Sequence, residues 1–133
     1  MVDIEQLEKV LLRRALERRS VTYGELLAFF ERRVTRVTVM AICRDIGEVC
    51  RRIEAGGGGP EDIACLVVRK SDGLPGEGYF RSLREEGSYD GPSFGPQAEA
   101  EIARRQEDVF RHVAALAARS GASIQADHTD LAG

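Results

Sequence analysis

The most nucleophilic side chains in this sequence are three cysteines, Cys43, Cys50 and Cys65. A thiol attacks as its thiolate, which needs a base or a cation nearby. The two histidines, His112 and His128, are far from all three cysteines in the sequence. No two cysteines have the two-residue spacing of common zinc sites. We therefore expect reduced thiols that pack as small apolar side chains, with no metal and no cofactor.

Arginine is the second candidate for chemistry, because 17 of the 19 basic residues are Arg. A guanidinium group makes planar, bidentate contacts to phosphate, carboxylate or guanine. The net charge of −3 does not decide the matter, since nucleic-acid binding depends on where the positive charge gathers. The alternative is a solvated face of ordinary ion pairs, because acidic residues interrupt the basic run. The basic residues that could form a DNA-binding surface are Arg33, Arg36, Arg44, Arg51, Arg69 and Lys70.

Length and composition indicate one domain that can form a core without disulfide bonds, since the chain has 133 residues and 43% hydrophobic residues. The first residues lack the basic and apolar regions of a signal peptide. No apolar run reaches the length of a membrane span. We expect a cytoplasmic protein that does not enter a membrane.

Apolar residues recur every three or four positions in several segments, which is typical of helices with one buried face. The pattern predicts helices over residues 3–18, from after Tyr23 through Phe30, over 38–55 and over 97–119. The β-branched Val21 and Thr22 favour a short extended piece, VTY at 21–23, before the second of these helices. Gly121 should end the last helix, so residues 121–133 are predicted to be a mobile tail.

A strand and a turn follow the third predicted helix. The apolar run IACLVVR at 63–69 has the length and the β-branched residues of a strand, and SDG at 71–73 is a strong turn signal. Residues 79–83 could form the returning strand. The sequence thus predicts an α+β fold, a winged helix-turn-helix with three helices and a β-hairpin wing over residues 1–120, with an additional C-terminal helix.

Three segments, VTYGEL at 21–26, CRDIGEVC at 43–50 and CLVVRKSDG at 65–73, resemble landmarks in the DNA-binding domain of O6-alkylguanine alkyltransferases and alkyltransferase-like proteins. The resemblance covers about half the chain. It implies that Tyr23 lies beside the phosphate of a flipped nucleotide. It also implies that Arg44 lies on the recognition helix and enters the duplex in place of the extruded base.

The resemblance fails at the reactive centre. Cys65 stands at the place of the alkyl-accepting cysteine, but Leu66 replaces the activating histidine and Ala64 replaces the preceding proline. A cysteine in an apolar segment without a neighbouring base should have a raised pKa. We therefore expect no alkyl transfer.

These observations predict a non-enzymatic protein that binds double-stranded DNA in a regulatory or repair-associated role. The expected site consists of Tyr23 and the six basic residues named above. One alternative is a protein-interaction module that forms a homodimer through the last helix and the wing, and an exposed apolar stripe at Phe110, Val113 and Leu116 would favour it. The other is a thiol-dependent alkyl-transfer repair enzyme that uses Cys65.

Overall fold

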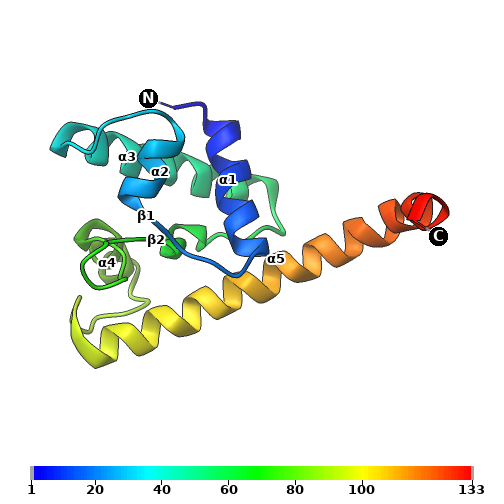
Figure 1. The fold of residues 1–133 in the computed structure, drawn as a ribbon. Coiled ribbons are helices and arrows are strands. Elements are labelled where there is room, and N and C mark those ends of the chain that lie inside the picture. The colour runs from blue at the N-terminus through cyan, green and yellow to red at the C-terminus, as the bar shows by residue number, and fades with distance from the viewer. Residues whose placement is uncertain (1, 133) are drawn as a thin grey trace.

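The protein is a mostly helical α+β fold with one small sheet (Figure 1). The computed structural model describes the backbone of residues 2–132 and the side chains of residues 2–120. The elements in chain order are α1 (Ile4–Leu16), β1 (Val21–Thr22), α2 (Tyr23–Phe29), α3 (Arg36–Gly56), the 3₁₀ helix η1 (Ile63–Leu66), β2 (Val67–Val68), α4 (Glu77–Glu86) and α5 (Gly95–Ala132).

The first three α-helices begin at side-chain caps, which satisfy backbone N–H groups that a helix start leaves without partners. At α1, the Asp3 carboxylate accepts a hydrogen bond from the Gln6 N–H at 3.0 Å. Thr22 forms a capping box with Glu25 at the start of α2, and Thr35 forms one with Thr38 at the start of α3. These helices lie where the apolar periodicity predicts them, with ends that differ by a few residues.

The sheet consists of β1 and β2, which pair in parallel with Val21 opposite Val67. The predicted strand at 63–69 is therefore correct only at its centre, because Ile63–Leu66 form η1 instead. Three of the four residues of η1, Ile63, Cys65 and Leu66, are buried. This 3₁₀ turn packs its buried residues against α1 and α5.

The predicted β-hairpin wing is wrong. Tyr79, Phe80 and Leu83, which were expected in its returning strand, lie in α4. Phe80 and Leu83 are three positions apart and both buried, so they share one face of a helix. The helix starts after Gly76 and ends at Gly87, whose φ of 75° is the left-handed conformation common at helix ends.

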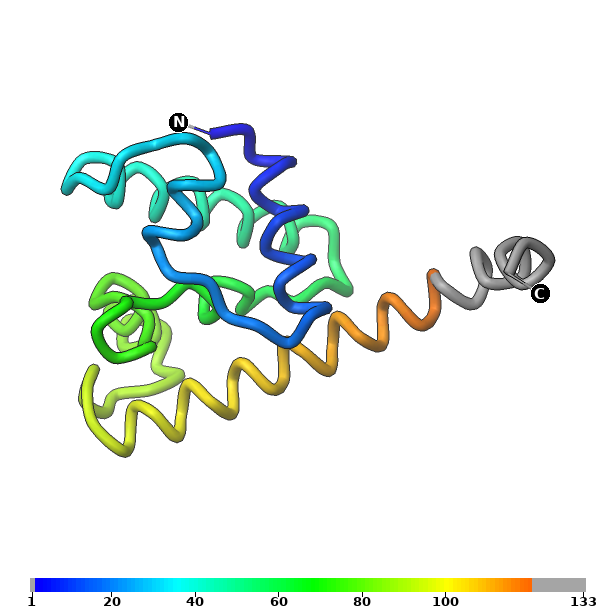
Figure 2. The backbone as a smooth tube through the Cα atoms, viewed as in Figure 1, coloured from blue at the N-terminus to red at the C-terminus, as the bar shows by residue number. Residues whose placement is uncertain are grey.

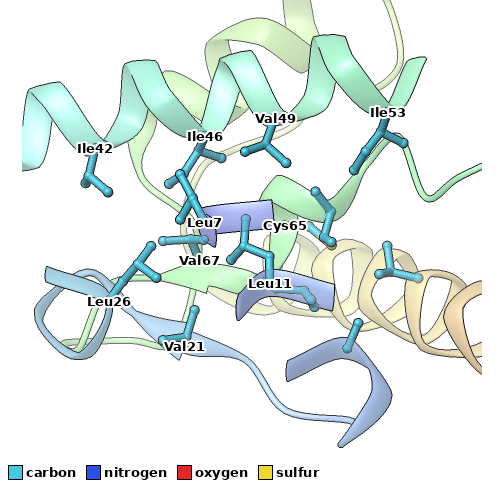
Figure 3. Packing of buried hydrophobic residues seen from close by; sticks show 14 of the residues in the cluster. Leu7, Leu11, Val21, Leu26, Ile42, Ile46, Val49, Ile53, Cys65 and Val67 are labelled. Atoms are coloured by element: carbon cyan, nitrogen blue, oxygen red, sulfur yellow. The ribbon is translucent and has the colours of Figure 1, made fainter. Parts of the chain in front are cut away.

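The main hydrophobic core lies between α1, α3, η1, the sheet and α5 (Figure 3). One face of α3, formed by Ile42, Ile46, Val49 and Ile53, packs on Leu7 and Leu11 of α1. A second cluster joins α4 to the first half of α5, and half-buried Tyr79 packs against both clusters. Its buried members are Leu74, Phe80, Leu83, Tyr89, Ala98 and Ile102.

Helix α5 runs along the body beside α1 and η1 and then extends past the end of α1 (Figure 2). The segment 121–133, predicted as a mobile tail, lies outside the residues whose side chains the structure describes. In the part of the chain that the structure describes, no helix is both long enough and apolar enough to cross a membrane.

Candidate nucleic-acid interface

The outer face of α3 lies opposite the face that packs in the core. Arg36, Met40 and Arg44 follow one another at intervals of four residues and are all exposed. Val37 stands beside them and is 75% exposed, and Met40 is 57% exposed. The first half of α3 therefore presents arginines and large apolar side chains on one surface.

The charge of this surface is positive. No Asp or Glu occurs between Arg32 and Arg44. Among the residues with described side chains, the guanidinium groups of Arg33, Arg36 and Arg44 have no hydrogen-bond or ion-pair partner. The amino end of α3 adds the positive end of the helix dipole. These groups can donate hydrogen bonds to phosphate oxygens without first breaking an ion pair.

Arg51, predicted as a DNA contact, is placed differently. Its guanidinium group donates to Glu48 Oε2 from Nη2 at 2.7 Å and from Nε at 3.0 Å, within the second half of α3. Between the two halves lies Gly47, where an added Cβ would meet only Arg51 Nη1 at 3.7 Å. Among the residues with described side chains, none requires a glycine at position 47.

Arg69 is engaged in the loop that follows β2. It donates to both Asp72 oxygens at 3.1 and 3.0 Å and to the Ser93 carbonyl oxygen at 3.2 Å. Its guanidinium carbon lies 4.8 Å from the centre of the Phe94 ring. Lys70, the next residue, is exposed. Arg69 thus stabilises the loop, and the predicted pair of wing cations becomes one engaged arginine beside an exposed lysine.

Tyr23 joins the start of α2 to the loop before α4. Its hydroxyl oxygen accepts a hydrogen bond from the Gly76 N–H at 3.3 Å. Burial raises the pKa of Tyr23 to about 12, and the Cys43 thiol beside it acts in the same direction. Tyr23 is therefore a neutral hydroxyl at physiological pH, positioned between α3 and this loop.

Cys65 is fully buried in η1. Burial raises the pKa of its thiol, and the negative charge of Asp62 raises it further. The two other cysteines, exposed Cys43 and half-buried Cys50, also have a pKa raised mainly by burial. His112, on α5, contacts the Gly58 carbonyl oxygen at 2.7 Å. Nowhere among the residues with described side chains do three or more potential metal ligands come together.

A polar cluster between α4 and α5 was not foreseen from the sequence. Tyr79 Oη donates to Asp62 Oδ1 at 2.7 Å, and Arg105 Nη1 donates to Asp62 Oδ2 at 3.2 Å. Arg105 Nε also donates to Glu101 at 2.6 Å, an ion pair of the same-face kind that the spacing on α5 predicts. The sequence prediction missed this cluster because it put Tyr79 in a returning strand, where the tyrosine would not be expected to contact Asp62.

The comparisons with known proteins give no neighbour: no family model, no curated protein and no solved structure matches this chain. The site must therefore be interpreted from its own geometry. That geometry is a basic, partly apolar face on α3, with Tyr23 beside Cys43 of the same helix.

Proposed function

We propose that this protein is a non-enzymatic DNA-binding protein that contacts duplex DNA through the outer face of α3. The main support for this proposal is that three exposed arginines, Arg33, Arg36 and Arg44, have no side-chain partner among the described residues. Exposed ion pairs on a protein surface are common and contribute little. A run of thirteen residues, 32–44, that contains arginines and no acid is better explained by an anionic partner.

The exposed apolar residues support contact with a groove of the DNA and not with its phosphates alone. Val37 and Met40 lie between the arginines, where a purely electrostatic surface would carry polar residues. Apolar side chains contact thymine methyl groups or sugar and base edges in DNA grooves. Gly47 supports the same proposal, because a glycine without an internal reason allows a partner's backbone to come close.

The α2–α3 pair would then serve as a helix-turn-helix with α3 as its recognition helix. We propose a resemblance to a winged helix for α1, α2 and α3 only, because a helix, α4, stands where the returning strand of the wing was expected. A regulatory or repair-associated role is consistent with this surface. The burial and raised pKa of Cys65 support a protein that does not transfer alkyl groups.

The test is a binding titration on a short labelled DNA duplex at several salt concentrations. We expect affinity to fall steeply with salt, and Arg36→Ala and Arg44→Ala each to weaken binding and to reduce the slope of log affinity against log salt by roughly one. Arg119→Ala is the matched control, because it removes an exposed arginine from α5. Absence of binding at low salt, or equal losses in all three variants, would refute the proposal.

A further inference from the structure

Val37 and Met40 form an apolar pair on the outer face of α3. Both side chains are more than half exposed. They are three residues apart in the helix, so they are neighbours on its surface. Neither belongs to the two hydrophobic clusters of the described residues. The pair therefore has no role in the core and is open to a partner.

Two arginines flank the apolar pair along α3. Arg36 and Arg44 are eight residues apart, which corresponds to about 12 Å along the helix axis. Met40 lies midway, four residues from each arginine. The major groove of B-DNA is about 12 Å wide and admits an α-helix, whereas the minor groove is only about 6 Å wide. The spacing thus lets both guanidinium groups reach phosphates at the borders of a major groove while the apolar pair faces the base edges.

The first turn of α3, which carries Arg36 and Val37, is held by its capping box. The Thr38 N–H donates to Thr35 Oγ1 at 3.0 Å, and the Thr35 N–H donates to Thr38 Oγ1 at 2.9 Å. These two bonds fix the backbone from which the outward side chains project. A surface that is already formed loses little conformational freedom when it binds.

We propose that Val37 and Met40 bind the C5-methyl group of a pyrimidine in the major groove of duplex DNA, an inference that rests on the proposed function. The valine side chain has no polar atom and the methionine sulfur is a weak acceptor, so neither can satisfy the donors and acceptors of the base edges. The apolar group that the four base pairs present in the major groove is the methyl group of thymine. 5-Methylcytosine presents a methyl group at the same position, so the shared chemistry is a methylated C5 atom.

The test compares the affinity of the full chain for duplexes that differ only at C5. One pair is a duplex of alternating dA and dT and the same duplex with uracil, which lacks the methyl group, in place of thymine. The other pair is a duplex of dG and dC and the same duplex with 5-methylcytosine in place of cytosine. Repeating sequences offer the C5 position in many registers, so the preferred sequence need not be known.

We expect the wild type to bind the methylated member of a pair more tightly, by roughly fourfold for each methyl group that is buried. A preference in both pairs supports recognition of the methyl group wherever it occurs. A preference in the first pair alone identifies thymine as its source, and a preference in the second pair alone identifies 5-methylcytosine.

Variants separate the apolar pair from the arginines. Val37→Ala combined with Met40→Ala should bind both members of a pair equally and keep the salt dependence of binding. Arg44→Ala should weaken binding to both members and keep their ratio. Leu16→Ala is the matched control, because it removes a side chain of α1 that is 49% exposed, and it should change neither quantity. Circular dichroism of each variant checks that it folds.

Equal affinity of the wild type for both members of both pairs, with salt-dependent binding intact, overturns this inference and leaves the proposed function in place. Insertion of the apolar pair into the minor groove would give that result, since the methyl group lies in the major groove. A preference that survives the double substitution also overturns it, because the methyl group would then act through the shape of the DNA. Absence of binding to every duplex at low salt refutes the proposed function and this inference together.

Discussion

The hydroxyl of Tyr23 accepts a hydrogen bond from the Gly76 N–H at 3.3 Å, and this contact holds the loop before α4 against the start of α2. A Cβ on Gly76 would lie 3.0 Å from the same hydroxyl oxygen, closer than most Cβ contacts. The two residues therefore fit each other closely, and Gly76 needs to be small because of its neighbour and not because of its backbone, whose φ is −70°.

This relationship predicts a coupled pair of mutations. Gly76→Ala should destabilise the protein, because Tyr23 must move and lose its hydrogen bond, at a cost of about 1 kcal/mol. In a Tyr23→Phe background, Gly76→Ala should cost less, since the closest atom is gone and the next lies 3.7 Å away. Urea unfolding of the two single variants and the double variant measures the coupling. Additive losses would show that the contact is not tight.

The capping box of α2 predicts a pH effect. The Thr22 N–H holds the pKa of Glu25 below its usual value of 4.5. A carboxyl with a lowered pKa in the folded state adds stability above its unfolded pKa, and this contribution is lost as the pH falls through the folded pKa. Wild type should thus exceed Glu25→Gln in stability at pH 7, and the difference should shrink when both are unfolded by urea at pH 3.

Gln at this position is an informative control, because its side chain can still accept the hydrogen bond of the capping box but carries no charge. A wild-type advantage that is as large at pH 3 as at pH 7 would show that the charge of Glu25 does not contribute.

The three thiols should react in order of exposure. A maleimide at pH 8 should label exposed Cys43 first and half-buried Cys50 later, while fully buried Cys65 should react only when the protein unfolds. Mass spectrometry of peptides after timed labelling identifies each site. Cys43→Ser should remove the fast phase. Rapid labelling of Cys65 in the folded protein would instead revive the alkyl-transfer alternative.

Substitutions at Gly47 should affect stability and DNA binding differently. Because a glycine inside a helix is less favourable than alanine, Gly47→Ala should raise the free energy of unfolding by about 0.5–1 kcal/mol. Gly47→Leu should fold well and yet bind duplex DNA more weakly, since its side chain would project from the outer face of α3. Ala103→Leu, at an exposed position of α5, is the control for added bulk. Unchanged DNA affinity in Gly47→Leu would argue against close contact at this point.

Much of the helical framework could be predicted from the sequence by itself. The apolar spacing of Leu7, Leu11 and Ala15 on α1, and of Ile42, Ile46 and Val49 on α3, repeats at the helical period, and the structure buries these residues. Helix starts could be predicted as well, since capping is a local interaction between residues three apart. The basic character of residues 32–44 is equally a property of the sequence.

Only the tertiary structure decided what the segment after η1 becomes. Short apolar runs fit a strand or a helix equally well, and the choice at 79–83 depended on contacts with α5 and with Asp62, which lie far away in the sequence. The same holds for charge: Arg44 and Arg69 look alike in the sequence, but folding brings Ser93 and Phe94 to Arg69 and not to Arg44. The pairs Arg51–Glu48 and Arg69–Asp72 join residues three apart, but the contacts of Arg69 with Ser93 and Phe94 come from long-range packing, which local patterns do not record.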